Sequence, residues 1–467
     1  MGPLRETILI ICAAGGVIVA STGCVRSRTW RLGGAPPPAS HRAEADGETN
    51  VPVGSWGAPH ETHGHSAPTS TPVRPALPDQ LSFLFITIDT LRPDLGYTGY
   101  ERPVSPNIDE LASRSIIYER AYSISTYTAY AVPPMMASRY PSEMPRNDRH
   151  EARYFPKNVM LAERLHDAGY HTAGAASHFL FSRELGWVDG LEKFVMTGAE
   201  GNTSSGSGID YRHTSRPLAD SAIRFLENPT IVSGKFFIWV HFLDPHKKYL
   251  EHPGFSNFGK DPRALYDGEI AFTDFHIGRV LRALAASPAA DRTVVILTGD
   301  HGEAFGEHGF FYHGRHIWDE VVRIPFLIYV PGAEPRTIAR RMSTVDIAPT
   351  ILDLAGLPAD KEARGESLAL EIFGGELAPR PILIDQPRNP NYPPKRGFIE
   401  GPYKLHHAID TDTYRLFDLD LDPGETNDLA ESQPKVLANV QHSYAEFVSR
   451  IVEFTPKRTI PYPKDNP

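Results

Sequence analysis

The chain has 467 residues, 41% of them hydrophobic, and a formal net charge of −10. This length and composition are sufficient for a large buried core. The moderate negative charge, with no long run of Lys or Arg, argues against broad nucleic-acid binding and against docking on an anionic membrane surface.

The N-terminal segment has the features of an export signal. Arg5 precedes an apolar run from Ile8 to Ala20 that is too short to span a bilayer, and small residues then lead to Cys24. The residues before Cys24 resemble the processing box of bacterial lipoproteins, although Ser21 stands where a larger aliphatic residue is usual. We expect a lipoprotein-type signal peptide at 1–23, a lipid on Cys24 that anchors the chain to a membrane, and export to the bacterial cell envelope. An ordinary exported protein or an uncleaved anchor is the alternative.

The segment 24–80 is rich in Pro, Gly, Ser, Thr and His and has no apolar periodicity, which predicts a disordered linker. Its cluster His60-Glu-Thr-His63-Gly-His65 is more typical of a solvated loop than of a closed metal site. The chain has two cysteines, Cys12 and Cys24. Removal of the signal peptide would leave Cys24 alone, so the mature domain would have no internal disulfide and no cysteine nucleophile.

From Leu81 onward, short apolar β-branched runs alternate with helical patterns. The predicted strands are Leu81–Ile88, Lys235–Phe242, Thr293–Leu297 and Phe326–Val330. The predicted helices are Asn107–Arg120, Val159–Ala168, Ser215–Glu227, Tyr266–Ala285 and Val345–Ala355. This alternation predicts an α/β fold with a mostly parallel central sheet flanked by helices, and we place this catalytic domain at 81–375.

The pattern changes after about residue 375. Arg396–His406 and Tyr414–Leu419 are typical of antiparallel strands, and a turn at Asp422–Glu425 precedes a helix around Pro434–Val452. We therefore expect a small C-terminal antiparallel α+β subdomain at 376–467.

Two apolar runs end abruptly at acids: the first at Asp89, the other at Asp300-His301. The carboxyl ends of parallel strands meet at one edge of a sheet, so these three side chains should converge. Asp89 could instead cap a helix, but convergence with the other two favours a divalent-metal site. Mixed carboxylate and imidazole ligands suit zinc or manganese better than calcium. The sequence leaves open which of these ions binds, and whether a second one does. Glu303 is expected to orient His301.

A third run ends in His241-Phe-Leu-Asp244-Pro-His246. His246, just past the strand, is well placed to protonate a leaving oxygen, whereas His241, inside the strand, is expected to be a core histidine. His313 follows in Gly306–Arg315 and is expected to contact the anionic part of a substrate, with Asp244 as a second substrate-binding candidate.

Taken together, the motifs of this chain resemble those of the sulfatase family, within the alkaline-phosphatase-like superfamily of metal-dependent esterases. The matching motifs are Asp89-Thr-Leu-Arg-Pro-Asp94, Ser105-Pro-Asn-Ile-Asp-Glu-Leu-Ala112, Leu243-Asp-Pro-His246, Thr298-Gly-Asp-His-Gly-Glu303, Gly306-Glu-His-Gly309, Val345-Asp-Ile-Ala-Pro-Thr350, Tyr403-Lys-Leu405 and Leu416-Phe-Asp-Leu419 with Asp422–Ala430. Several ordered motifs together are far more specific than any one alone.

The resemblance implies a nucleophile in the loop that opens a helix after the first strand–helix unit. Sulfatases proper use formylglycine made from Cys or Ser, but ungapped counting back from Tyr140-Pro141 places Thr128 there. A gapped alignment on Pro133 would place Ala131 there and make the site inert. Threonine cannot become formylglycine, but it can act as a metal-activated hydroxyl, as in phosphate-transferring relatives. Arg92 is the remaining catalytic candidate.

These residues predict an exported metal-dependent hydrolase that cleaves sulfate, phosphate or phosphonate esters of small molecules or glycans. Thr90 and Thr128 stand where many sulfatases have an acid and a Cys or Ser, and His301 replaces an Asn. These departures favour phosphodiester or phosphonate ester substrates. The alternative is an inactive sulfatase-like lipoprotein that binds a glycan or envelope polymer.

Overall fold

A computed structural model of the chain describes residues 77–78, 80–197 and 213–456, which belong to one compact unit. The predicted signal peptide, Cys24 and nearly all of the predicted linker lie outside the described residues. Among the helices of the described ranges, none is both long and apolar enough to cross a membrane.

An eight-stranded sheet forms the centre of this unit. Its spatial order is β10 (Arg336–Ser343), β2 (Ile116–Tyr122), β9 (Arg323–Tyr329), β6 (Thr293–Gly299), β1 (Ser82–Ile88), β5 (Phe236–Phe242), β3 (His171–Ala176) and β4 (Lys193–Met196). β9 runs antiparallel to both of its neighbours, and the remaining pairs are parallel. The predicted mostly parallel sheet is therefore confirmed.

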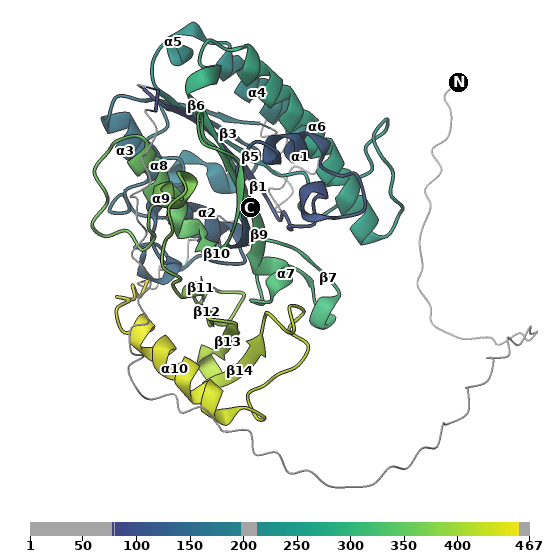
Figure 1. The fold of residues 1–467 in the computed structure, drawn as a ribbon, viewed down its shortest axis with the longest axis vertical. Helices are drawn as coiled ribbons and strands as arrows, with labels where there is room; N and C mark the ends of the chain where they lie inside the picture. Colours follow the sequence, from purple (N-terminus) through teal and green to yellow (C-terminus); the bar gives the residue numbers. More distant parts are fainter. Residues whose placement is uncertain (1–76, 79, 198–212, 457–467) are drawn as a thin grey trace, which may run out of the picture. The chain divides into compact units, whose positions relative to one another are not determined.

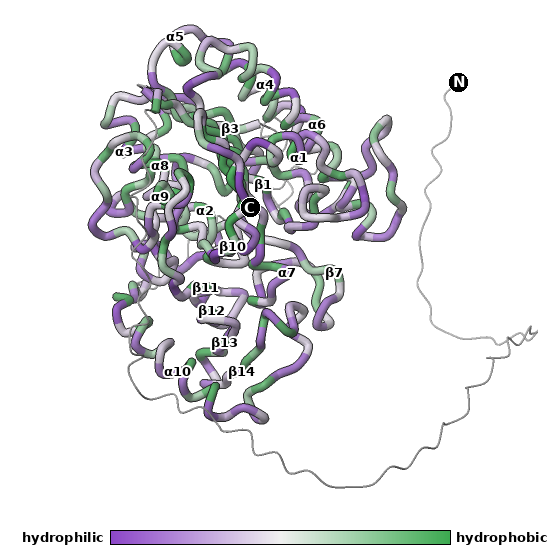
Figure 2. The backbone as a smooth tube through the Cα atoms, in the orientation of Figure 1, coloured by the Kyte–Doolittle hydropathy of each residue, from purple (hydrophilic) through white to green (hydrophobic). Residues whose placement is uncertain are grey.

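The innermost strands are apolar on both faces because helices cover both sides of the sheet. Every residue of β1, β5 and β6 is buried. Such strands appear as continuous hydrophobic runs in the sequence, and Figure 2 shows the central strand β1 mainly in the hydrophobic colour. This is why these three strands could be predicted from the sequence alone.

Helices pack on the two faces of the sheet (Figure 1). On one face lie α1 (Pro106–Ala112), α4 (Ser215–Leu226), α5 (Pro229–Val232) and α6 (Pro262–Ala286). On the other lie α2 (Thr128–Ala137), α3 (Leu161–Asp167), α8 (Ile347–Leu354) and α9 (Ala369–Ile372). The long helix α6 begins where Asp261 accepts a hydrogen bond from the Ala264 amide and Pro262 takes the first helical position.

A second, antiparallel sheet follows near the C-terminus. It contains β11 (Ile382–Gln386), β12 (Lys395–Glu400), β13 (Tyr403–Ala408) and β14 (Thr413–Asp418). The helix α10 (Pro434–Val448) packs against β13 (Figure 1). Between β6 and β9 the chain forms the hairpin of β7 (Ala304–Phe305) with β8 (Phe311–Tyr312), and then α7 (Asp319–Val322). Buried residues of β7 and α7 share a hydrophobic cluster with the second sheet. The predicted antiparallel sheet near the C-terminus is therefore confirmed.

Two secondary-structure predictions were wrong. The predicted helix Asn107–Arg120 ends at Ala112, and strand β2 begins at Ile116, where β-branched and aromatic residues favour a strand. The predicted strand Arg396–His406 is a hairpin, because Gly401-Pro402 separates β12 from β13. The strands β3, β4 and β10 were not predicted, since β3 is rich in Ala and Gly and β10 in Arg.

Candidate functional site

The parallel register places the predicted metal ligands side by side. Ile88 of β1 pairs with Gly299 of β6, so the next residues, Asp89 and Asp300, leave the sheet together. The Asp300 amide donates to the Ile88 carbonyl at 3.2 Å. Asp89, Asp300 and His301 are buried, and each offers a ligand atom within 4.8 Å of the others.

The turn that carries Asp300 and His301 depends on Gly302. A Cβ at this position would overlap the backbone oxygen of Glu320. The close approach lets the Gly302 amide donate to the Val321 carbonyl at 3.0 Å, which ties the turn to α7. The glycine is therefore required for this close approach of the turn to α7.

In each of the two carboxylates, of Asp89 and Asp300, one oxygen has neighbouring polar groups and the other has no hydrogen-bond partner among the described residues. Oδ1 of Asp300 accepts hydrogen bonds from the amides of Thr90 (3.2 Å) and His301 (2.8 Å), while Oδ2 has no hydrogen-bond partner within the described ranges. Oδ1 of Asp89 is likewise buried and without a partner among the described residues. Nε2 of His301 lies 3.5 Å from Asp300 Oδ2 and 3.8 Å from Asp89 Oδ1.

These three atoms fit a divalent cation. Ligands held about 2.0–2.2 Å from one ion stand roughly 3–3.5 Å apart, close to the separations seen here. Two buried oxygens without donors are costly unless a cation neutralises them. Burial and the charge of Asp89 raise the pKa of Asp300. Burial alone would raise the pKa of Asp89 as well, but the neighbouring histidines 246, 241 and 301 hold it well below its usual value.

Helix α2 brings Thr128 to the same point. Thr128 is its first residue and is buried, and its Oγ1 lies 3.1 Å from His301 Nε2 and 3.5 Å from Asp89 Oδ2. The gapped alternative, Ala131, lies in the same helix but has no functional group to offer. The amino end of a helix carries partial positive charge, which favours an anionic group at Thr128.

His246 and His313 line the site beside His301. The His313 ring centroid lies 5.0 Å from that of His246 and 4.5 Å from that of His301. Burial lowers the pKa of His246, and it lowers that of His313 to about 4. His313 is therefore mainly neutral at pH 7. The Nδ1 of His246 donates to the Lys247 carbonyl at 2.8 Å, so its Nε2 is the atom free to exchange protons.

Two predicted residues, Arg92 and Asp244, have partners other than those expected. The Arg92 guanidinium pairs with Asp94 (2.8 Å) and Glu307 (2.7 Å), which neutralises its charge. The Asp244 carboxylate accepts three hydrogen bonds from Thr214 and Ser215, at the start of α4. Their predicted catalytic and substrate contacts stay predictions.

Glu303 does not orient His301, contrary to expectation. It accepts hydrogen bonds from His313 Nδ1 (2.9 Å) and Tyr249 Oη (2.8 Å). The carbonyl of Gly302 orients His301 instead, through Nδ1 at 3.0 Å. Glu303 therefore supports His313, the predicted substrate contact.

Two more histidines border the site. His178 follows β3, and burial lowers its pKa to about 3, with smaller effects from the charges of His246 and Asp89. It was missed because the Ala-rich β3 does not have the pattern of a strand. His241, expected to be a core residue, is fully buried in β5, yet its Nε2 lies 3.5 Å from Asp89 Oδ2.

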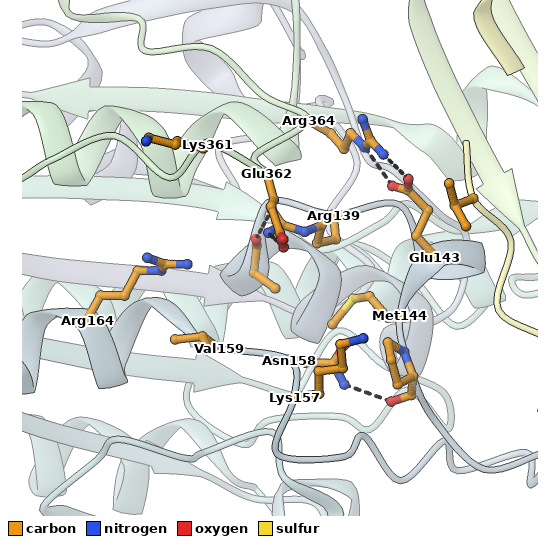
Figure 3. A pocket seen from close by; sticks show the side chains of 13 residues that line it. Arg139, Glu143, Met144, Lys157, Asn158, Val159, Arg164, Lys361, Glu362 and Arg364 are labelled. Atoms are coloured by element: carbon orange, nitrogen blue, oxygen red, sulfur yellow. Dashed lines mark hydrogen bonds and ion pairs between the residues drawn. The ribbon is translucent and has the colours of Figure 1, made fainter. Parts of the chain in front are cut away.

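A separate cavity of about 530 Å³ lies at the other end of α2, lined by Ala137 and by several cations (Figure 3). Arg139 pairs there with Glu362 at 2.8 Å, and Arg364 pairs with Glu143. Helix geometry places this end about 14 Å along the axis from Thr128. Because acids within or beside the cavity neutralise much of its charge, we assign it no part in the reaction.

A mostly parallel sheet with a polar site at its strand ends, followed by a small antiparallel sheet, defines an α/β protein with the same fold as solved sulfatase structures. The chain belongs to the sulfatase family. The sulfatase family model matches residues 82–357, and a model of the C-terminal part of N-sulphoglucosamine sulphohydrolase matches residues 306–451. This confirms the predicted family and the enzyme class, hydrolase of ester bonds.

Individual relatives are similar at modest identity. The choline-sulfatase of Rhizobium meliloti is 25% identical over 404 residues, covering 70% of this chain and 78% of that protein. The crystal structure of the phosphonate monoester hydrolase of Agrobacterium radiobacter superposes with a TM-score of 0.65 at 21% identity, covering 79% of this chain and 95% of that one. A solved 2-O GAG sulfatase superposes with a TM-score of 0.66 at 21% identity, covering 80% of this chain and 92% of that one.

Proposed function

We propose that this protein is a divalent-metal-dependent hydrolase in which the Thr128 hydroxyl attacks the phosphorus or sulfur of an ester. One observation carries the proposal: Oγ1 of Thr128 lies 3.1 Å from His301 Nε2, beside Asp89 Oδ1 and Asp300 Oδ2, two buried oxygens that have no hydrogen-bond partner in the described part of the chain. Asp89, Asp300 and His301 would hold the cation, which would lower the pKa of the hydroxyl and neutralise developing negative charge.

The chain's own groups account for the bond changes. The Thr128 hydroxyl, whose pKa a bound cation would lower, gives its proton to solvent as Oγ1 bonds to the phosphorus or sulfur. The bond to the leaving oxygen breaks, and that oxygen takes a proton from protonated His246. Water then hydrolyses the Thr128 ester and regenerates the hydroxyl. The start of α2 stabilises negative charge at this position throughout.

The substrate is proposed to be a phosphodiester or phosphonate ester of a small molecule or glycan, with sulfate esters as the second choice. The absence of a formylglycine precursor at position 128 motivates the first choice. The similarity to both a choline-sulfatase and a phosphonate monoester hydrolase supports keeping both classes. The alternative of an inactive polymer-binding lipoprotein has no support from the comparisons.

The test compares turnover of aryl sulfate, aryl phosphate, phosphodiester and phosphonate esters by protein loaded with Zn²⁺ or Mn²⁺. Thr128→Val keeps the side-chain shape and should lower kcat by about 10³-fold or more, whereas Thr128→Ser should retain measurable turnover. Thr126→Val is the matched control, because this buried hydroxyl bonds only Gln386 among the described residues. Equal rates for wild type and Thr128→Val would remove Thr128 from the mechanism.

Export and lipidation are proposed from the sequence of the N-terminal segment. Processing at Cys24 would anchor the enzyme to the cell envelope. Cys24→Ser should move the protein from the membrane fraction to the soluble fraction of the producing bacterium, and an unchanged distribution would refute the lipid anchor.

A further inference from the structure

His241 is a buried polar residue that the reaction described above does not use. It lies in β5 opposite Thr87 of β1, and its side chain is completely buried. Its Nδ1 is 2.8 Å from Thr87 Oγ1, and its Nε2 is 3.5 Å from Asp89 Oδ2. The ring therefore bridges the interior of the sheet and a predicted metal ligand.

The hydrogen-bond network determines which ring nitrogen carries the proton. The indole Nε1 of Trp239 donates to Thr87 Oγ1 at 3.0 Å, and an indole N–H can only donate. The Thr87 hydroxyl therefore has its own hydrogen available for His241 Nδ1. The opposite tautomer would leave that hydroxyl hydrogen buried without an acceptor among the described residues, which is unfavourable. The proton of neutral His241 thus belongs on Nε2, facing Asp89.

His301 has the opposite tautomer. Its Nδ1 lies 3.0 Å from the Gly302 carbonyl, which can only accept, so Nδ1 carries the hydrogen. Nε2 of His301 therefore presents a lone pair to the carboxylate cluster, as a metal ligand requires. The two histidines on either side of Asp89 are thus chemically distinct: one presents a lone pair and the other an N–H.

We propose that His241 is a positioning residue, which donates its Nε2–H to Asp89 Oδ2 and so keeps Asp89 Oδ1 directed at the cation. Asp300 has the same arrangement, with Oδ1 held by the amides of Thr90 and His301 and Oδ2 left for the cation. The proposal rests on the metal site of the proposed function, and it adds that His241 tunes this site without binding the cation.

Packing holds the ring in this orientation. The Phe181 ring centroid lies 4.7 Å from that of His241, and the Trp239 ring centroid lies 6.4 Å away. Both aromatic side chains are buried. A donor fixed in this way keeps a metal ligand in its binding orientation, and loss of such a partner typically lowers metal affinity 10- to 100-fold.

The experiment measures the affinity of the full chain for Zn²⁺ and Mn²⁺ by competition with a chelator. His241→Leu fills the space without a donor and should weaken binding about 10- to 100-fold. His241→Gln places an N–H near the original Nε2 and should restore affinity to within about fivefold of wild type. The absorption spectrum of the Co²⁺-loaded His241→Gln protein should match that of wild type, because the ligand set is unchanged.

Each outcome decides one point. Wild-type affinity in His241→Leu would overturn the positioning role. Equal losses in the Leu and Gln variants, with a changed Co²⁺ spectrum, would make His241 a ligand and overturn the assigned tautomer. Asp300→Asn separates this inference from the proposed function: a wild type that binds no divalent ion, or an Asp300→Asn protein that binds as well as wild type, refutes the metal site itself.

A measurement on wild type covers the case in which the His241 variants do not fold. Long-range ¹H–¹⁵N correlation spectra of the metal-free full chain distinguish the two neutral histidine tautomers. Thr87→Val keeps the side-chain shape but removes the hydroxyl that lies between Trp239 and His241. The histidine signal that changes in this variant is therefore assigned to His241. A proton on Nε2 in wild type is the expected result, and a proton on Nδ1 would overturn the proposal.

Discussion

The buried ammonium of Lys404 connects the C-terminal sheet to the catalytic domain, and its removal should be strongly destabilising. Lys404 lies in β13 with a completely buried side chain. Its Nζ lies 2.8 Å from Asp319 Oδ1, at the start of α7, and 2.9 Å from Glu425 Oε1. Lys404→Met keeps the length of the side chain but leaves two buried carboxylates without their cation.

The magnitude follows from these contacts. Two charge-assisted hydrogen bonds at about 1.5–3 kcal/mol each give roughly 3–6 kcal/mol. Breaking a buried ion pair from one side typically costs about 3–5 kcal/mol. We therefore expect the free energy of unfolding to fall by about 4 kcal/mol, and the thermal midpoint to fall by roughly 5 °C for a chain of this size.

Urea unfolding at pH 7 measures this loss. Lys435→Met is the matched control, since Lys435 is exposed on α10 and should change stability by less than about 0.5 kcal/mol. If the two variants unfolded at the same urea concentration, the ion pairs of Lys404 would contribute nothing measurable and the reasoning would be wrong.

The same variant has a predictable pH dependence. Burial alone would raise the pKa of Glu425, but Lys404 and His406 outweigh it and lower the pKa from 4.5 to about 2. A depressed carboxyl pKa adds stability that is fully present above pH 4.5 and is lost as the pH falls towards 2. The difference in the free energy of unfolding between wild type and Lys404→Met should therefore become smaller between pH 4.5 and 2. A difference that stayed constant over this range would contradict the ion pair with Glu425 as its cause.

Three further predictions concern the site. Removal of divalent ions by a chelator should lower the thermal midpoint, and a metal at 100 times its dissociation constant should raise the free energy of unfolding again by about 2.7 kcal/mol. A thermal midpoint that changes with neither treatment would argue against a bound ion. Gly302→Ala should lower the free energy of unfolding in urea by about 1–3 kcal/mol and weaken metal binding, because the new Cβ would overlap the Glu320 backbone oxygen. Gly268→Ala is the control and should change neither quantity, since a Cβ there would make only an ordinary contact. His246→Asn should slow the cleavage of esters with poor leaving groups more than that of activated aryl esters, and an equal loss across a leaving-group series would exclude His246 as the proton donor.

Much of the site was predictable because the strands that build it are buried on both faces. Each of these strands gives a continuous apolar run, so its end is visible at the first acid or histidine. Asp89, Asp300 and His301 were predicted in this way, and the register between β1 and β6 places them together, while their role as metal ligands stays a prediction. His178 was not found because the strand before it is too rich in Ala to be recognised.

Partner choice was not predictable from the sequence. Arg92 and Asp244 have the residue types of catalytic groups, yet their partners are Asp94, Glu307 and the start of α4. Glu303 lies two residues from His301 but supports His313, which follows ten residues later on the hairpin. Sequence proximity does not determine which side chain a buried carboxylate contacts, because the turn geometry decides the direction in which each one points.

The sequence alone determined the mostly parallel α/β class, the family and the group of residues from which the site is built, because each depends on local patterns or on motifs. Tertiary structure decided the rest. Only the packing of α2 against the strand ends placed the Thr128 hydroxyl within 3.1 Å of His301. Only the contacts between β1 and β5 gave His241 a tautomer and an orientation. Both are long-range contacts, since 173 residues separate Thr128 from His301 and 154 separate Thr87 from His241.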